Sequence, residues 1–263
     1  MRIVVPMKAV PDLVEEIEIT PDESGIQREY LKFVLNEWDG QALEEALLIK
    51  DAAAAEVVAV GLSDDQEIDQ ILYTALAKGA SSAVKLVSSG SGAQPAPIGI
   101  PVAARAALFA GYLRAQPADL VMSGVQAPDD PDGQLVPLLA ALLDVPHVSV
   151  VVSVEAAGPR VTVRQEFAGG RSHELDVQLP AVIGVQSARQ APRYAPVSRV
   201  KQAMQAGGLT EVAVSPLAAG TSAVLRRVRR PEVSGHAEML GGSAGDVAGQ
   251  IVGLLRARGL VKG

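Results

Sequence analysis

An α/β fold with a doubly wound, mostly parallel sheet, an antiparallel extension and a C-terminal arm is the architecture that the sequence predicts. As far as Val154, short apolar runs alternate with helix-like segments, which is the order of right-handed βαβ units. Apolar residues make up 48% of the chain and aromatic residues only 3%. The core is therefore built from Ala, Val, Leu and Ile, which suits parallel strands covered by small-residue helices. With 263 residues the chain can bury such a core.

The strands of the parallel sheet are predicted from short runs of aliphatic and β-branched residues bounded by turn residues. The first, Arg2–Met7, is expected to be buried. The others are Glu56–Gly61, Ala83–Val87, Asp119–Ser123 and His147–Val154.

Helices are predicted between these strands. The first begins near Asn36 and continues through Lys50, where Asn36 is a favourable N-cap type and Asp39 places an acidic group near the positive helix end. The apolar positions of this helix share one stripe. The remaining helices are Gln66–Lys78, which Gly79 ends, then Val102–Ala115 after a Ser/Gly/Pro-rich loop (Ser88–Pro101), and Gly133–Leu143.

Two segments depart from the parallel pattern. Glu16–Thr20 alternates apolar and polar residues and precedes a turn, Pro21–Gly25, so a hairpin is expected before the first helix. Arg160–Glu166 and His173–Val177 are predicted to form an antiparallel pair around Ala168–Gly170, and the strand Ala181–Val185 follows.

Beyond Gln205 the sequence has little core-forming pattern. It contains Gly207-Gly208, Pro216, the small-residue run Ala218–Gly220 and an arginine-rich segment, Val224–Arg230, before a final helix, Val247–Arg258. So long a stretch is uncommon inside a compact domain. We expect residues 1–205 to form the α/β nucleotide-binding domain and residues 206–263 to form an arm that packs on a partner. A disordered tail is the alternative, against which the apolar last helix argues.

Several function classes are excluded or disfavoured. The absence of cysteine excludes disulfides and thiolate chemistry, and a net charge of −7 disfavours nucleic-acid binding. No apolar run approaches the ~18–20 residues that span a bilayer. The N-terminus is strand-like and lacks a signal-peptide pattern, so a cytoplasmic protein is expected. His147, His173 and His236 are scattered, and neither a metal site nor a Ser-His-Asp pattern is predicted.

A ligand of an open parallel sheet binds beyond the carboxyl ends of its strands, at helix N-termini. Three segments lie there: Pro6–Asp12, Gly61–Asp65 and Ser123–Gln134. In the last, Gly124 and Gly133 permit close backbone approach, which favours a nucleotide phosphate. Its aspartates would repel a phosphate unless they turn away, cap the helix or share a cation, so an acidic capping loop is the alternative. No GxGxxG or P-loop motif is present.

Two further features invite a functional interpretation. Trp38, the sole tryptophan, stands at a helix start and is either a packing residue or a wall against a flat ring. Pro192 and Pro196 stiffen the segment between Ala181–Val185 and a basic helix-like run. We expect a projecting loop with Arg193 and Tyr194 at its tip, both of which are interface-anchoring types, or else a plain surface turn.

Five motifs, taken in order, point to a family. They are VPMKAVPDLVEEIEITPDESGI, NEWDGQALEEALLIKD, TALAKGA, VQAPDDPDGQLVPLLAALLDVP and LPAVIGVQSARQAPRYAPVSRVKQA. Together with the arginine-containing tail and terminal helix, they resemble the β subunit of electron transfer flavoproteins along nearly the whole chain. The resemblance implies a Rossmann-like domain, a heterodimer with an α subunit that holds the redox FAD, and electron transfer from flavin-dependent dehydrogenases to a downstream acceptor. No substrate chemistry of its own is expected.

The resemblance also implies roles for particular residues. The β subunit binds AMP, or a second FAD in electron-bifurcating members, and Leu13 and Trp38 would approach the flavin of the α subunit. The C-terminal arm would wrap the α subunit. The nucleotide site would be lined by Pro6, Asn36, Trp38, Asp39, Gly124, Gln126, Ala127, Pro128, Asp129, Gly133 and Gln134.

A recognition loop near residues 189–200 would dock partner dehydrogenases through Arg193, Tyr194, Ala195, Pro196 and Val197, with Val197 where a leucine anchor usually stands. The Gln126–Gln134 loop is shorter and richer in aspartate than the family pattern, which leaves AMP, a second FAD and an empty site open. Two other functions stay possible from the residues: a nucleotide-binding sensor or scaffold without a redox role, and a bifurcating member with its own FAD.

Overall fold

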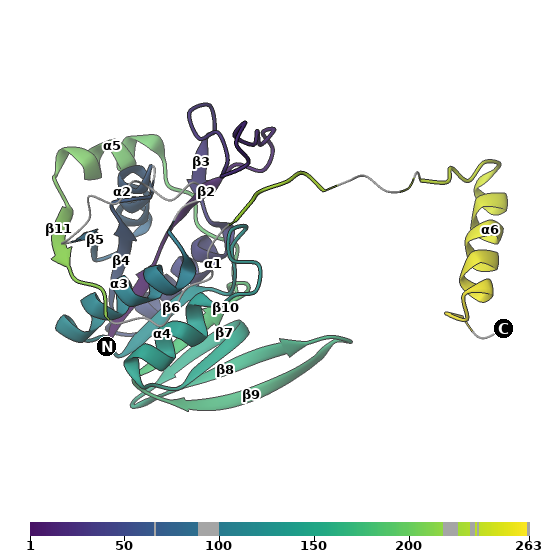
Figure 1. The fold of residues 1–263 in the computed structure, drawn as a ribbon. Coiled ribbons are helices and arrows are strands. Elements are labelled where there is room, and N and C mark those ends of the chain that lie inside the picture. The colour runs from purple at the N-terminus through teal and green to yellow at the C-terminus, as the bar shows by residue number, and fades with distance from the viewer. Residues whose placement is uncertain (66, 89–99, 218–225, 232–234, 236, 262–263) are drawn as a thin grey trace. The chain divides into compact units, whose positions relative to one another are not determined.

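The computed structural model describes residues 1–65, 67–88, 100–217, 226–231, 235 and 237–261. The chain divides into two compact units, Met1–Val228 and Arg229–Gly263. The first unit contains a large sheet with helices on both faces, and the second contains a single labelled helix, α6 (Figure 1).

The main sheet has nine strands in the order β11-β5-β4-β1-β6-β10-β7-β8-β9. The pairs from β11 to β7 are parallel, and the last two pairs, β7 with β8 and β8 with β9, are antiparallel. The strands are β1 (Arg2–Pro6), β4 (Glu56–Leu62), β5 (Ser82–Ser88), β6 (Leu120–Gly124), β7 (His147–Ala157), β8 (Arg160–Phe167), β9 (Arg171–Gln178), β10 (Ala181–Val185) and β11 (Leu209–Val214).

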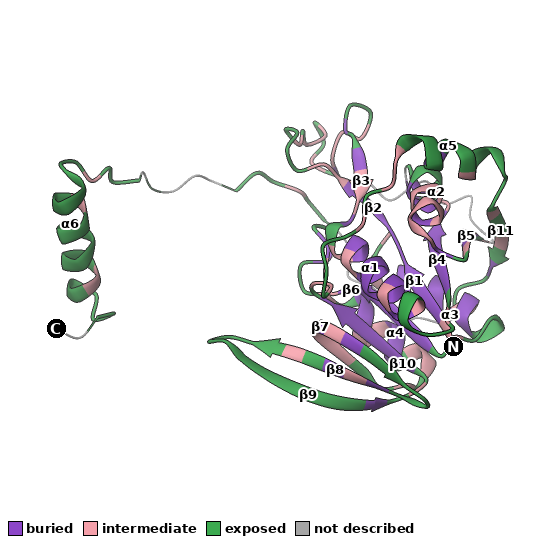
Figure 2. Ribbon diagram, turned by 180° about the vertical axis from the view of Figure 1, so that it is seen from behind, coloured by how far each residue is buried: buried purple, intermediate pink, exposed green. Residues whose placement is uncertain are grey.

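Helices cover both faces of this sheet. Successive side chains of a strand point to opposite faces, so Ile3 and Val5 pack in one core cluster and Val4 in the other. The first cluster includes residues of α1 (Glu37–Ala52) and α2 (Ile68–Lys78), and the second includes residues of α3 (Val102–Ala115) and α4 (Leu135–Leu143). Apart from Arg2 and Glu56 at their starts, the central strands β1, β4, β6 and β10 are buried, whereas β8 is about half exposed and β9 is largely exposed (Figure 2).

The predicted α/β class with a mostly parallel sheet is confirmed, as are its strands, the four helices and the antiparallel pair. The boundaries differ by a few residues. For example, α4 begins at Leu135 because Gly133 adopts φ +64° and donates its N–H to the carbonyl of Asp130 in a turn. Gln66 and most of the loop Ser88–Pro101 lie outside the described residues.

The hairpin predicted around the turn Pro21–Gly25 is present only in a short form, because the segment Glu16–Thr20 does not make a strand. Ile19 and Ile26 form an isolated antiparallel bridge, and main-chain hydrogen bonds join Thr20 to Gly25 and Gln27 to Glu18. The antiparallel pair is instead made by β2 (Ala9–Pro11) and β3 (Phe33–Leu35), where Val10 and Phe33 are buried. Alternation alone does not make a long strand: Ile17 and Ile26 are only partly buried against the core, and Glu15 and Glu16 are exposed.

The expectation of a loop-like chain beyond Gln205 is also wrong. The basic helix α5 (Val197–Gln205) packs on α2, and β11 then pairs in parallel with β5 along Leu209–Val214. An edge strand has one neighbour and buries few side chains, and only Val214 of β11 is buried. Its core pattern is therefore weak in the sequence. Ala218–Gly220 and Val224 lie outside the described residues.

In the second unit, α6 (Ala244–Ala257) begins three residues earlier than predicted. A capping box accounts for this, because the Ser243 side chain accepts from the Asp246 N–H and Asp246 accepts from the Ser243 N–H. Ile251, Val252 and Leu254 of this helix are exposed.

Candidate functional site

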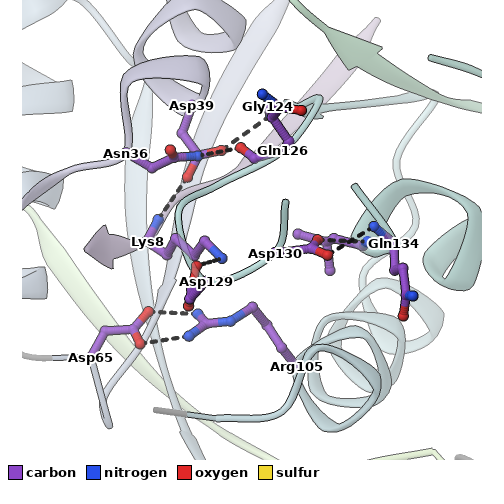
Figure 3. Close-up of polar contacts among 11 residues, drawn as sticks. Lys8, Asn36, Asp39, Asp65, Arg105, Gly124, Gln126, Asp129, Asp130 and Gln134 are labelled. Atoms are coloured by element: carbon purple, nitrogen blue, oxygen red, sulfur yellow. Dashed lines mark hydrogen bonds and ion pairs between the residues drawn. The ribbon is translucent and has the colours of Figure 1, made fainter. Parts of the chain in front are cut away.

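The strongest convergence of polar side chains lies at the carboxyl ends of β1 and β6. The start of α1 and the Val125–Gln134 loop before α4 complete it, as Figure 3 shows. This is the edge of the sheet where a ligand was predicted, and it brings together residues from four segments far apart in the sequence.

Asp39 joins three of these segments. Its carboxylate accepts the Lys8 N–H at 3.0 Å through Oδ2 and the Gly124 N–H at 3.1 Å through Oδ1. Burial raises the pKa of Asp39 to about 6, although the Lys8 charge and the hydrogen bonds act against this. A Cβ at Gly124 would lie 2.5 Å from Asp39 Oδ1 and 2.7 Å from the Trp38 carbonyl carbon. Only glycine permits this close approach.

Asn36 stands at the N-cap position of α1 but makes no side-chain capping bond. Its Nδ2 instead donates to the Gln126 carbonyl at 3.0 Å and so ties the loop to the helix start. The expected capping role is corrected, because the buried amide reaches the loop rather than its own helix. Among the described residues, Asn36 Oδ1 and Ser123 Oγ are buried without a hydrogen-bond partner.

Asp130 organises the loop and the start of α4. Its Oδ1 accepts the Gln134 N–H at 3.0 Å and its Oδ2 accepts the Leu135 N–H at 3.1 Å. Its main chain pairs with Ala127 in both directions. The carboxylate therefore caps α4 from within the loop, and the acidic-capping alternative raised by the sequence describes this residue.

Two ion pairs complete the site. Lys8 Nζ is paired with Asp129 Oδ1, and the Lys8 side chain is only 7% exposed. Arg105 holds Asp65 with two hydrogen bonds, of 2.6 and 2.7 Å, and both side chains are buried. Burial by itself would lower the pKa of Arg105, but the carboxylate of Asp65 raises it above the ordinary value.

Sequence reasoning did not single out Lys8, Asp65 or Arg105. Arg105 could have been found, because it is the one charge within the apolar run VAARAALFAGYL of α3. A charge at such a position is buried and needs a partner. Nothing local pointed to Asp65 as that partner.

The residues present do not fit a nucleotide phosphate at the start of α4. Such a phosphate binds free N–H groups of the first helical turn and a nearby cation. Here Asp130 accepts the N–H groups of Gln134 and Leu135, and Pro137 has none. Lys8 and Arg105 are already paired with carboxylates.

The other predicted site residues lie as follows. Pro6 is the buried last residue of β1, Trp38 is half-buried in the first turn of α1, and Leu13 is 63% exposed in the excursion between β2 and β3. Within the loop, Ala127 is buried and Pro128 exposed. Pro6, Trp38 and the loop thus share one edge of the sheet, while Leu13 belongs to the exposed excursion beside it.

The segment before α5 is fastened to α1. Arg193 donates from Nε to Glu44 at 3.0 Å and from Nη2 to Asp51 at 2.9 Å, and its N–H donates to Glu44 at 2.8 Å. Arg189 donates its N–H and Nε to the buried Glu45, and the Ala188 N–H donates to Gln41. We name these contacts the α1 latch.

The five predicted docking residues differ in how far they are exposed. Tyr194 is 81% exposed and Val197, the first residue of α5, is 63% exposed. Ala195 and Pro196 are half-buried. Arg193 does not project with Tyr194 as expected, because the acidic side chains of α1 hold its guanidinium within the chain.

Within the described residues, no group of three or more His, Asp or Glu side chains is placed to hold a metal ion. The described helices are all too short or too polar to cross a membrane. His236 lies outside the described residues.

Comparisons with known proteins find relatives that match nearly the whole chain. The family model described as "Electron transfer flavoprotein domain" matches residues 25–217. The electron transfer flavoprotein subunit beta of Methylophilus methylotrophus is 30% identical over 267 residues, which cover 97% of this chain and 98% of the relative. The caffeyl-CoA reductase-Etf complex subunit CarD of Acetobacterium woodii is 30% identical over 99% of this chain and 100% of its own. The mitochondrial subunit beta of Arabidopsis thaliana is 32% identical over 77% and 78%.

Proposed function

Because this chain belongs to the β-subunit family of electron transfer flavoproteins, we propose that it pairs with an FAD-carrying α subunit and shuttles electrons from flavin-dependent dehydrogenases to a downstream acceptor. The observation that carries this proposal is the similarity to a β subunit over 97% of the chain, which includes both compact units. The FAD, held mainly by the α subunit, supplies the redox chemistry. This chain positions the flavin and docks the donor, without substrate chemistry of its own.

Trp38 and Leu13 are the residues that we propose to lie near the flavin. Trp38 is fixed by the close contact of its backbone with Gly124 at the start of α1. Leu13 presents an exposed apolar side chain, which a partner surface can cover.

Tyr194 and Val197 are proposed as the docking residues. Both are exposed and apolar, and the α1 latch holds the backbone on which they stand. An ordered loop loses less conformational entropy on binding than a free one. Arg193 then acts as a positioning residue, while Ala195 and Pro196 shape the turn between the two contact side chains.

The segment Arg229–Gly263 is proposed as the arm that wraps the α subunit. Its helix α6 presents Ile251 and Leu254 one turn apart on one side. A helix with an exposed apolar stripe is typical of a segment that packs on a partner.

A second candidate is a subunit of a larger reductase complex. The similarity to CarD over 99% of the chain favours it. A bifurcating member would need its own FAD in the β subunit, and the capped, carboxylate-rich start of α4 argues against that cofactor. Membership of the flavoprotein family argues against a sensor or scaffold without a redox role.

The decisive experiment is co-expression of the full chain with an α-type flavin subunit. We expect a yellow heterodimer that a flavin-dependent dehydrogenase reduces. Replacing Val197→Asp together with Tyr194→Ala is expected to abolish that reduction and to leave the heterodimer intact. Gln202→Asp, which adds the same charge further along exposed α5, is the control. A colourless chain that does not associate would contradict the proposal, and unchanged transfer in the double variant would contradict the docking assignment.

A further inference from the structure

We propose that Asp129 and Asp130 stand in for the nucleotide phosphate at the start of α4, so that this chain holds its site together without AMP or a second flavin. The family resemblance leads one to expect an adenine nucleotide at this edge of the sheet. The residues that would receive its phosphate are engaged with each other instead.

The N–H groups at the start of α4 are already bound within the chain. The carboxylate of Asp130 accepts the Gln134 and Leu135 N–H groups at 3.0 and 3.1 Å, and its carbonyl accepts the Gly133 N–H at 3.1 Å. Three consecutive N–H groups are thereby satisfied by one residue. An incoming phosphate would have to displace a carboxylate that is already optimally placed at the positive helix end.

The two cations near this edge, Lys8 and Arg105, are also already paired. Lys8 is buried and paired with Asp129, and Arg105 grips Asp65 through both guanidinium nitrogens. Both positive charges are therefore balanced before any ligand arrives. A phosphate brought to this edge would meet the carboxylates of Asp129 and Asp130 at close range, and this repulsion disfavours it.

The backbone of the Val125–Gln134 loop is held by contacts within the chain. Asn36 holds the Gln126 carbonyl, and Ala127 and Asp130 pair through their main chains. Gly133 lies so close to the Val125 carbonyl that a Cβ there would overlap it. The loop thus folds on itself over the helix start and does not need a ligand to order it.

This inference does not depend on the electron-carrier role, because nucleotide content and melting temperature report on it directly. A protein that transfers electrons but contains AMP would overturn the inference and leave the proposed function standing. A nucleotide-free protein that transfers no electrons would do the reverse.

The first experiment is extraction of nucleotides. The full chain, alone and co-expressed with an α-type subunit, is denatured and the released nucleotides are identified by mass. We expect no more than a trace of AMP in either sample and no FAD beyond that of the α subunit. One AMP per chain, or two FAD per heterodimer, would overturn the inference.

The second experiment measures melting temperatures. With 1 mM AMP the unmodified chain is expected to melt unchanged, whereas a ligand bound with a dissociation constant 100-fold lower would raise the melting temperature by about 5 °C. Asp130→Ala is expected to lower it by about 3 °C, because it removes the cap of α4. The control Asp132→Ala, an exposed carboxylate on the same loop, is expected to change it by less than about 1 °C.

A third experiment tests whether inorganic phosphate can replace the two carboxylates. Asp129→Ala with Asp130→Ala frees Lys8 and the helix N–H groups, so 50 mM inorganic phosphate is expected to raise its melting temperature more than that of the unmodified chain. Equal responses to phosphate, or equal losses in Asp130→Ala and Asp132→Ala, would contradict the substitution of carboxylate for phosphate. If the Asp130 variants do not fold, the nucleotide content and AMP response of the unmodified chain still decide.

Discussion

At the residue scale, individual buried carboxylates hold separate segments of this chain together. Asp39 is buried and receives two backbone N–H groups from segments 31 and 85 positions away. Asp130 caps α4, and Asp65 pairs with Arg105 inside the core. Buried charges require such partners, so each carboxylate constrains the structure around it.

The titration of Asp39 gives a prediction of stability against pH. The pKa of Asp39 is raised from the ordinary 3.8 to about 6 in the folded chain. Protonated Asp39 therefore stabilises the fold below about pH 4, and this contribution is lost as the pH rises through 6. Two pKa units correspond to about 3 kcal/mol. Asp39→Asn removes the titration. We therefore expect the difference in unfolding free energy, unmodified minus Asp39→Asn, to fall by about that amount from pH 4 to pH 7 in urea titrations. A constant difference would show that Asp39 does not titrate in this range.

The Arg105–Asp65 pair gives a second prediction. Arg105→Met alone leaves a buried carboxylate unpaired and is expected to lower the unfolding free energy by about 3–5 kcal/mol. Arg105→Met with Asp65→Leu removes both charges and is expected to cost much less. Urea unfolding of the two variants measures this. If the double variant loses as much unfolding free energy as the single variant, the two side chains do not stabilise each other.

At the scale of elements, α1 has two functions along its length. Its first turn supplies Asn36 and Asp39 to the site, and its later turns supply Gln41, Glu44 and Asp51 to the α1 latch. One helix therefore fixes both the polar cluster at the sheet edge and the segment before α5, for which docking is proposed. The sequence predicted this helix but not its acidic contacts.

The latch gives a prediction for docking. Arg193→Ala frees the loop, and we expect the KM for the donor dehydrogenase to rise about tenfold, the equivalent of about 1.4 kcal/mol of lost preorganisation. The stability of the chain is expected to fall as well, by about 1–3 kcal/mol, because the buried carboxylate of Glu44 loses its guanidinium partner while it keeps the N–H of residue 193. Arg193→Lys should rescue little, since lysine lacks the forked donors.

The control for this prediction is Arg199→Ala, which removes an exposed arginine of α5. Steady-state reduction of the heterodimer, together with limited proteolysis of the loop, separates the two variants. A KM that rises equally in both would assign the effect to charge and not to loop position.

Elements that the sequence predicted well are those with a strong local period. The helices and the central strands each show an apolar pattern that one segment carries by itself. The pairing of β2 with β3 and the edge strand β11 were missed. Their placement depends on distant partners, β3 being 24 positions beyond β2 and β5 more than 120 positions before β11.

At the scale of the whole molecule, the boundary between compact units falls at Val228 and not at Gln205. Helix α5 and strand β11 belong to the first unit, and Arg229–Gly263 forms the second. The proposed arm is accordingly shorter than residues 206–263.

A truncation tests this division. A chain ending at Val228 is expected to unfold cooperatively near the melting temperature of the full chain but to bind the α-type subunit at least tenfold more weakly, because the apolar side of α6 is removed. Analytical ultracentrifugation and thermal unfolding check both statements. If the truncated and full chains bind the α-type subunit with equal affinity, Arg229–Gly263 does not act as the proposed arm.

Point variants separate the apolar side of α6 from its length. Ile251→Asp with Leu254→Asp should weaken association as the truncation does. Gly249→Asp with Gly253→Asp adds the same charges on the other side of the helix, where neither added Cβ meets a neighbour, and should not. The arm assignment fails if the two pairs behave alike.

The sequence by itself determined the α/β order, the mostly aliphatic core and the family motifs, because composition, apolar periodicity and turn residues can be read without the fold. It also pointed to the Ser123–Gln134 loop, where polar side chains do converge. Only the tertiary structure decided which partners the charged residues of this loop and of the segment before α5 have. Lys8 meets Asp129 across 121 positions and Arg193 meets Glu44 across 149. A buried charge selects its partner by distance in space and by desolvation, and neither is encoded in the spacing of residues along the chain.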